Sequence, residues 1–472
     1  MRIPDLPFNA LIATVLSDRL RYTGEGNKCS PHKLLGLTGL LAFAALSAGT
    51  VNAAEPSAEA NAAWTLHNLT QSPGRREGEA VVAINPAQPL NAFVAFIEEP
   101  RVKEIMKGYR TSDGGKTWVP ARFREESEFS PGGGNPSITA DQSGRLYLAY
   151  VTHEKDKPTR TVVMVSDDSG ASWSEAWSLP ILLDQPHITV STPDANGKSA
   201  LWLVGSTEKE LRAFTTNITP KAADLRMKEV MLGGIAGSAP SAKINNQVKV
   251  AARGLDDAWI IYQSMKLGEG NQITSEALWL LRVKQASSQA EVSTPERIAP
   301  LSGFAAFSHS QLLVAGEAGQ PGRLLLVMAG EEGAGLVLRE SRDNALKWSE
   351  PKVLHAVPML YLAAAYDAET KRLLVSGLAV EALPQPGLRQ FVVSHDLKSG
   401  KTETFGPMET AARPIPTDPP MNRVFGDYAG IAAASGRVIT TLSSNCPEVG
   451  GVKNPATFSD VGVVVFDSPT RP

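Results

Sequence analysis

The chain has 472 residues, with 46 Lys and Arg against 49 Asp and Glu and a formal net charge of −3. Hydrophobic residues make up 42% and charged residues 20%, a globular composition that excludes wholesale disorder, collagen and coiled coil. The near-balanced charge gives no field to attract nucleic acid or an anionic membrane, so we expect neither as a partner. Two cysteines cannot make a disulfide framework or a Cys-based zinc site.

The N-terminal segment has the pattern of an export signal. Lys28 and Lys33 precede an uncharged run at residues 34–49, and small residues follow at positions 51–54. This run has the length of a signal-peptide core and is short for a membrane span, although an anchor is the alternative. We therefore expect residues 1–53 to be a leader cleaved near Ala53 and residues 54–472 to form one domain without a membrane span. The mature protein would be periplasmic or secreted, and we expect a monomer.

An octapeptide recurs along the chain. Residues 111–118 read Thr-Ser-Asp-Gly-Gly-Lys-Thr-Trp and residues 166–173 read Ser-Asp-Asp-Ser-Gly-Ala-Ser-Trp, with their tryptophans 55 positions apart. A worn copy at residues 341–348 keeps the Ser, Asp and Trp, and a fainter one begins at residue 394. A fixed period of this length is the signature of a repeat architecture.

The chemistry of the octapeptide is structural. Its Asp carboxylate can accept hydrogen bonds from the N–H groups of its own turn, its Gly tolerates a positive φ, and its Trp is a large apolar plug. A strand-like run precedes each copy, which predicts a hairpin turn at a fixed place in a repeated antiparallel sheet. The structural residues of the three clearest copies are Asp113, Gly115, Trp118, Asp168, Gly170, Trp173, Asp343 and Trp348.

Further apolar strand pairs lie upstream of these turns and define the repeated unit. Units begin near residues 79, 135, 184, 240, 304, 360 and 425. Four strands per unit of this length predict an all-β propeller of four-stranded antiparallel blades. We count seven blades, and six blades with an inserted hairpin is the alternative, because the fourth unit has no octapeptide. The strand-like residues 64–70 are expected to complete the last blade beside residues 461–466.

The intact octapeptides resemble the Asp-box, or BNR, repeat of sialidase-like propellers. Residues 79–86, 134–137, 184–186 and 425–430 also look like the inner-strand openings of secreted bacterial BNR-repeat proteins. The resemblance spans roughly residues 64–467. It implies a propeller fold, and because Asp boxes support blades without doing chemistry, it leaves the function open between glycoside hydrolases, assembly factors and binding modules.

A sialidase would carry three arginines for a carboxylate, a Tyr nucleophile helped by Glu, an Asp acid/base and an Arg-Ile-Pro motif in the first blade. Here Arg2-Ile3-Pro4 lies in the expected leader, and Arg75 and Arg76 lack the Ile-Pro. This departure favours a binding role over sialidase activity.

Candidate site residues open the predicted inner strands, since ligands of propellers usually meet the upper ends of these strands. The expected ligand-binding residues are Asn135, Asp184, His309, Asp427 and Tyr428. The alternative is that short polar residues merely start strands and satisfy free N–H groups. No tight His spacing and no phosphate-binding loop is present, so we expect no metal and no cofactor.

We therefore predict an exported propeller that binds a glycan or a protein partner at the channel mouth. The alternatives are a sialidase-like glycoside hydrolase and an envelope assembly scaffold. In the hydrolase, Asp427 would be the acid/base, Tyr428 or Glu79 would lie on the nucleophilic side, and Arg423 would grip the substrate.

Overall fold

The computed structural model describes twenty segments of the chain, and everything below concerns these residues. They are 64–70, 75–99, 105–121, 132–153, 159–207, 210–219, 225–232, 244–267, 273–285, 290–301, 309–316, 322–330, 335–357, 359–381, 387–408, 413–414, 428–444, 448–449, 452–453 and 460–468. The expected leader at 1–53, together with Arg423 and Asp427, lies outside them.

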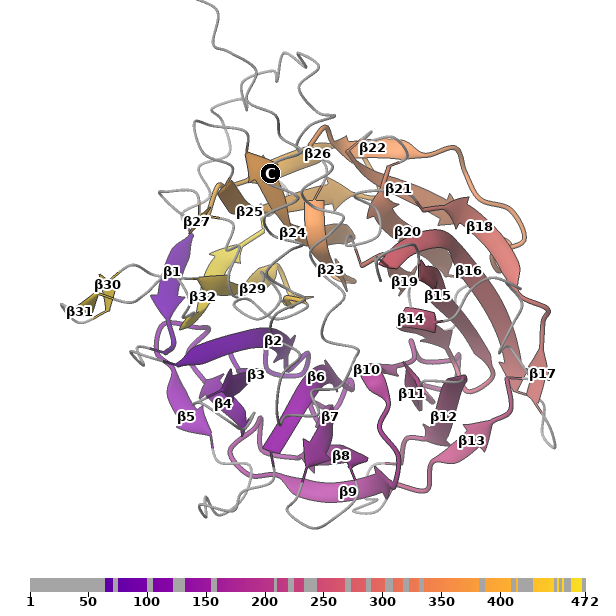
Figure 1. The fold of residues 1–472 in the computed structure, drawn as a ribbon, viewed down its shortest axis with the longest axis horizontal. Coiled ribbons are helices and arrows are strands. Elements are labelled where there is room, and N and C mark those ends of the chain that lie inside the picture. The colour runs from indigo at the N-terminus through magenta and orange to yellow at the C-terminus, as the bar shows by residue number, and fades with distance from the viewer. Residues whose placement is uncertain are drawn as a thin grey trace, which may run out of the picture.

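The described segments form seven antiparallel blades arranged in a ring, which confirms the predicted propeller and excludes the six-bladed alternative (Figure 1). Blade 1 contains β2 (Arg76–Ile84), β3 (Ala92–Glu99), β4 (Ile105–Thr111) and β5 (Val119–Ala121). Blade 2 contains β6 (Gly132–Ala140), β7 (Leu146–His153), β8 (Arg160–Ser166) and β9 (Ser174–Leu179). Blade 3 contains β10 (Asp184–Val190), β11 (Ala200–Ser206), β12 (Leu211–Asn217) and β13 (Lys228–Val230).

The fourth blade is complete although its sequence lacks the octapeptide. It contains β14 (Ile244–Arg253), β15 (Asp257–Leu267) and β16 (Ile273–Gln285), with β17 (Ala290–Val292) and β18 (Glu296–Pro300) both on the outer edge of β16. Blade 5 contains β19 (Gln311–Ala315), β20 (Arg323–Ala329), β21 (Leu336–Ser341) and β22 (Lys352–His355). Blade 6 contains β23 (Met359–Asp367), β24 (Arg372–Glu381), β25 (Gly387–Asp396), β26 (Thr402–Phe405) and β27 (Arg413–Pro414).

The last blade joins the two ends of the described chain. β28 (Ile431–Ala434), β29 (Arg437–Ser444) and β32 (Asp460–Asp467) are completed on the outside by β1 (Thr65–Asn68), which pairs antiparallel with β32. A small hairpin of β30 (Glu448–Val449) and β31 (Val452–Lys453) lies beside this blade in Figure 1. The prediction that residues 64–70 close the ring is confirmed.

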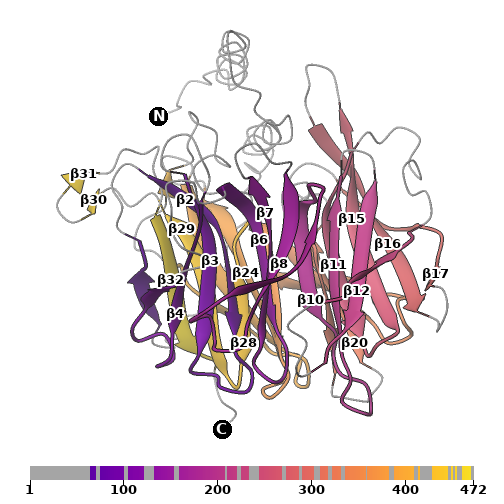
Figure 2. The same ribbon diagram turned by 90° about the horizontal axis from the view of Figure 1, so that it is seen from below.

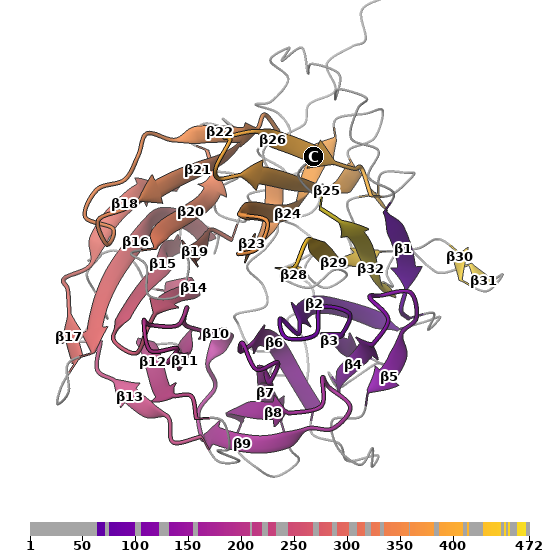
Figure 3. The same ribbon diagram turned by 180° about the vertical axis from the view of Figure 1, so that it is seen from behind.

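The innermost strand of each blade surrounds the centre of the ring (Figures 1 and 3). These strands are β2, β6, β10, β14, β19, β23 and β28, and each contacts the inner strands of both neighbouring blades. In blades 1 to 6 the innermost strand is the first of its blade in chain order, and in blade 7 β28 is the first of the three C-terminal strands, so all seven begin at the same end of the ring. The blades stand side by side around the axis when the ring is seen from the edge (Figure 2).

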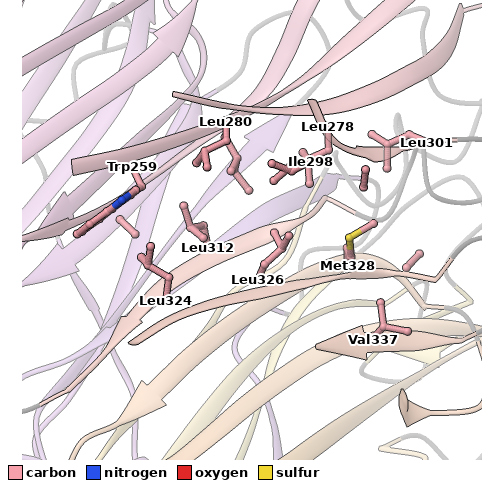
Figure 4. Close-up of a cluster of buried hydrophobic side chains, with 14 of the residues drawn as sticks. Trp259, Leu278, Leu280, Ile298, Leu301, Leu312, Leu324, Leu326, Met328 and Val337 are labelled. Atoms are coloured by element: carbon pink, nitrogen blue, oxygen red, sulfur yellow. The ribbon is translucent and has the colours of Figure 1, made fainter. Parts of the chain in front are cut away.

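The hydrophobic core is divided among the interfaces between blades. Within the described residues it forms seven clusters, each spanning two or more neighbouring blades. Between blades 4 and 5, for example, Trp259, Leu278 and Leu280 face Leu312, Leu324 and Leu326 (Figure 4). The sheets are apolar on both faces because a neighbouring blade covers each face, so their strands read as nearly continuous hydrophobic runs.

The octapeptides form the turns that follow the third strands of blades 1, 2 and 5. In the first turn, Asp113 accepts hydrogen bonds from the Thr111 hydroxyl at 2.8 Å, the Thr117 N–H at 2.9 Å and the Thr117 hydroxyl at 2.6 Å. Asp168 and Asp343 accept corresponding bonds within their own turns. These donors lower the pKa of the Asp113 carboxyl, because they favour its charged form.

Each of these turns also contacts the blade that precedes it in the ring. Arg437 of blade 7 donates to the carbonyl of Gly114 at 2.5 Å, and Trp259 of blade 4 donates to the carbonyl of Asn344 at 3.2 Å. In the blade 2 turn, the Trp173 ring lies edge-on to Phe93 of blade 1, with their centroids 4.9 Å apart. The turns therefore link blades as well as closing hairpins. At the fainter copy, Asp396 ends β25 and caps a shorter turn by accepting from the N–H groups of Lys398 and Ser399.

Candidate functional site

A backbone feature repeats where the inner strands begin. In six blades, one non-glycine residue close to the start of the inner strand has a positive φ between 46° and 56°. These residues are Glu79, Asn135, Gln185, Gln247, His309 and Tyr361. Five of them lie in a β-bulge, where the pairing with the second strand shifts register. A non-glycine residue in this region costs about 1–2 kcal/mol, so the repetition shows that the fold imposes the conformation at each inner strand.

The bulge brings a second set of side chains to the centre. Two positions after the positive-φ residue, pairing resumes with Val81, Ser137, His187, Lys249, Gln311 and Ala363. Of these, the side chains of Val81, His187, Lys249 and Gln311 keep part of their surface exposed. Since successive residues of a strand alternate between faces, the bulge decides which side chain faces the axis.

Several of these polar side chains bind the backbone of the next blade. Glu79 Oε2 accepts a hydrogen bond from the N–H of Asn135 at 3.0 Å, and Ser137 Oγ accepts one from the N–H of Ile188 at 3.0 Å. Thr441 of blade 7 donates to the carbonyl of Ala80 in blade 1 at 2.7 Å. Some of these residues therefore have the structural role that was the alternative to ligand binding. They form hydrogen bonds with backbone groups that the bulges remove from strand pairing.

His187 also accepts a hydrogen bond from the backbone of the next blade, and its second ring nitrogen can donate to a ligand. Its Nδ1 accepts a hydrogen bond from the N–H of Val250 at 3.2 Å, so in the neutral ring the proton is on Nε2. Burial, with a smaller contribution from the charge of Lys249, lowers the pKa of His187 well below its ordinary value. His187 is therefore neutral at pH 7 and presents an N–H.

Lys249 is the cation of this region. Its side chain keeps some exposed surface, but protein surrounds it, and this desolvation lowers its pKa to about 8. No carboxylate of the described residues forms an ion pair with it, and none contributes to its pKa. Its ammonium group lies 6.0 Å from the centroid of the Tyr428 ring, within the range of a cation–π contact.

Tyr428 joins three blades at this place. It precedes β28 of blade 7, its hydroxyl donates to the carbonyl of Pro136 in blade 2 at 2.9 Å, and its ring lies near Lys249 of blade 4. The side chain therefore extends past blade 1 toward the axis. The role of Tyr428 on the nucleophilic side of a hydrolase stays a prediction.

His309, which precedes β19, and Tyr361 of β23 form a more buried pair. Their rings meet edge to face with centroids 5.5 Å apart, and their exposed fractions are 4% and 5%. Burial and the charge of Lys249 lower the pKa of His309 to about 3, so this imidazole is also neutral at pH 7. Lys249 is thus bordered by two neutral histidines.

Five of the predicted site residues lie among the described residues, and two do not. Glu79, Asn135, Asp184, His309 and Tyr428 all lie at the beginnings of inner strands, and the amide of Asn135 approaches Asp184 Oδ1 at 3.5 Å while its N–H binds Glu79. Asp427 and Arg423 lie outside the described residues. The sequence analysis missed Gln185, Gln247, Tyr361, His187 and Lys249. The first three continue the series of Glu79 and Asn135 at intervals of 50 to 62 residues, so the repeat could have located them to within a few positions.

We call the group formed by Glu79, Asn135, Asp184, His187, Lys249, His309, Tyr361 and Tyr428 the axial ring. No set of three or more His, Cys, Asp or Glu side chains in the described segments is placed to hold a metal ion. Where the structure describes the chain, it also contains no helix with the length and hydropathy needed to span a membrane.

Comparisons with known proteins found similar solved structures that are named for different functions. No protein-family model and no curated protein matches the chain. Solved structures similar to it include the phage phi92 endosialidase, at 12% identity and TM-score 0.45 over 86% of this chain and 70% of that one. They also include a Penicillium chrysogenum α-L-arabinanase complexed with arabinobiose, at 11% identity and TM-score 0.43 over 85% and 98%. YCF48 bound to D1 peptide matches at 11% identity and TM-score 0.43 over 88% and 99%.

At such identities and TM-scores the likeness assigns no function, and assignment to the BNR repeat family stays a prediction. The chain is a seven-bladed propeller similar to structures of sialidase and arabinanase type.

Proposed function

We propose that the protein binds a ligand, a glycan or a segment of a partner protein, at the axial ring. One observation carries the proposal: partly exposed side chains of different chemistry converge there from blades 2, 3, 4 and 7. Asn135 supplies an amide, His187 an N–H, Lys249 a cation and Tyr428 an aromatic face. A few convergent polar groups beside an aromatic ring are typical of sites that orient a small ligand.

Hydrogen bonds that stabilise the fold do not explain every one of these four side chains. Glu79 and Ser137 are occupied by backbone N–H groups of the next blade, whereas Lys249 has no hydrogen bond to another described residue in the structure. Burying an amine costs free energy unless something compensates for it. A ligand that contacts Lys249 would supply that compensation.

Glycan and peptide arrays test this proposal directly. The wild-type protein would be compared with Asn135→Gly, which removes the amide but tolerates the φ of 54°. Thr189→Val is the matched control, because Thr189 lies two residues beyond His187 on β10 and outside the axial ring. We expect a ligand retained by the wild type and the control and weakened by Asn135→Gly. A ligand unaffected by Asn135→Gly, or a folded protein that retains nothing, would overturn the proposal.

Glycoside hydrolysis is a second candidate because Asn135 brings two carboxylates close together. Its N–H binds Glu79 and its amide approaches Asp184, and glycosidases use a pair of carboxyl groups on either side of the scissile bond. Turnover of fluorogenic glycosides, a sialoside included, would be measured for the wild type, Glu79→Gln and Asp184→Asn. Loss of turnover in both variants would support the hydrolase, and absence of turnover in the folded wild type would reject it.

We also propose that the mature protein is an exported monomer that begins after Ala53. The lysines and uncharged run of residues 28–49 support the export signal. N-terminal sequencing and sedimentation of the protein recovered from its host test both statements.

A further inference from the structure

Lys249 occupies a position that the fold repeats in each of the five inner-strand bulges. It is the first residue to resume pairing after the bulge on β14, where the corresponding residues of blades 1, 2 and 6 are Val81, Ser137 and Ala363. The propeller therefore does not require a lysine here. A charged side chain at this position costs desolvation energy that a small or apolar residue avoids.

The groups around Lys249 leave its charge uncompensated. His187 and His309 are both neutral at pH 7, and the Tyr428 ring offers only a weak cation–π attraction at 6.0 Å. The carboxylates of the ring lie elsewhere: Glu79 and Asp184 contact Asn135, and neither contributes to the pKa of Lys249. The described groups next to Lys249 are thus neutral, and the two carboxylates of the ring lie at Asn135 instead.

We infer that the axial ring recognises a ligand bearing a single carboxylate, which Lys249 binds through its ammonium group. This inference rests on the proposed function and names the chemistry of its ligand. One cation balances one negative charge, whereas a phosphate dianion would leave a net negative charge in a partly desolvated site. The Nε2–H of His187 is a second donor, and a carboxylate has two oxygens that accept from different donors.

The same chemistry could come from an acidic sugar or from an acidic side chain of a peptide. Sugar rings pack on aromatic faces as peptide side chains do, so Tyr428 suits both sources. The probes therefore come in matched pairs that differ in the carboxylate alone: glucuronate with glucose, and N-acetylglutamate amide with N-acetylglutamine amide.

Calorimetric titration of these pairs would use the wild type, Lys249→Met, Lys249→Arg and the control Thr189→Val. We expect at least one acidic probe to bind the wild type about ten- to a hundredfold more tightly than its neutral partner, the usual range for a charged hydrogen bond. Lys249→Met removes the charge with similar length, so it should abolish the preference. Lys249→Arg keeps the charge and should retain most of it, and Thr189→Val should behave as the wild type.

The outcomes separate this inference from the proposed function. If neutral and acidic probes bind equally, or if Lys249→Met keeps the preference, the carboxylate assignment is wrong while binding at the ring stands. If no acidic probe binds although an array ligand depends on Asn135, the assignment is also wrong. If neither probes nor array ligands depend on any ring residue, both proposals fail. Thermal unfolding of each variant shows that it is folded before its binding is compared.

Discussion

The ammonium group of Lys249 lies 6.0 Å from the centroid of the Tyr428 ring, although the two residues belong to blades 4 and 7. Tyr428 also binds the carbonyl of Pro136 in blade 2, which lies 292 positions away in the chain. A closed ring makes this contact possible, because it brings the beginnings of all inner strands to one end of the axis. Ring closure thus brings an ammonium group and an aromatic ring from distant parts of the chain into one site.

Lys249 should titrate below the ordinary lysine pKa of about 10.4, because desolvation disfavours its charged form. Its pKa of about 8 predicts a midpoint near that pH when its reaction with an amine-specific reagent is followed by peptide mass spectrometry. The exposed Lys198 in the same sample serves as the reference for reagent activity. A Lys249 midpoint at the ordinary value would show that its amine is fully hydrated.

Glu77 should make the stability of the protein depend on pH. Burial raises its pKa from 4.5 to about 8, with added repulsion from Asp460 and Glu98. The native state then holds a proton that the unfolded chain releases, so the free energy of unfolding falls as the pH rises from about 4.5 to about 8. Urea unfolding of the wild type and of Glu77→Gln at several pH values measures this effect. The variant should lose most of the decline, and equal slopes in both proteins would contradict the prediction.

Gly170→Ala should destabilise the octapeptide turn of blade 2. Gly170 has a φ of +88°, and a Cβ placed there would lie 2.1 Å from Cδ2 of Phe93 in the neighbouring blade. Strain and overlap together should cost about 2–4 kcal/mol. Gly197→Ala is the control, with a φ of +73° and nothing within 4 Å of the added Cβ. It should cost only about 1 kcal/mol. Equal losses in denaturant unfolding would show that the contact with Phe93 has no energetic role.

Removal of β1 should open the ring. Four residues of β1 pair with β32, and the N–H of Leu69 adds a bond to the carbonyl of Val461 at 2.9 Å. At about 0.5–1.5 kcal/mol for each hydrogen bond, deletion of residues 1–70 should cost a few kcal/mol. It should also promote association through the exposed edge of β32. Deletion of residues 1–63 leaves these bonds and should have the stability of the longer chain. Equal unfolding midpoints for the two deletions would contradict the role assigned to β1.

The fold could be predicted from the sequence because its determinants are local and repeated. The octapeptides located the ends of the third strands in blades 1, 2 and 5, and the unit beginnings near residues 79 and 135 coincide with the bulge residues Glu79 and Asn135. The site could be predicted only in part. Lys249 was missed because its blade has no octapeptide and because the bulge shifts which side chain faces the axis. The contact of Tyr428 with Pro136 depends on ring closure, which no local pattern encodes.

The most direct measurement is ligand protection of Lys249 itself. The folded protein would be modified with an amine-specific reagent with and without a ligand found on the arrays, and the labelled peptides would be quantified by mass spectrometry. The account predicts that the ligand slows modification of Lys249 while the exposed Lys198 reacts at an unchanged rate. A ligand that binds the protein and leaves both rates unchanged would show that binding occurs away from the axial ring.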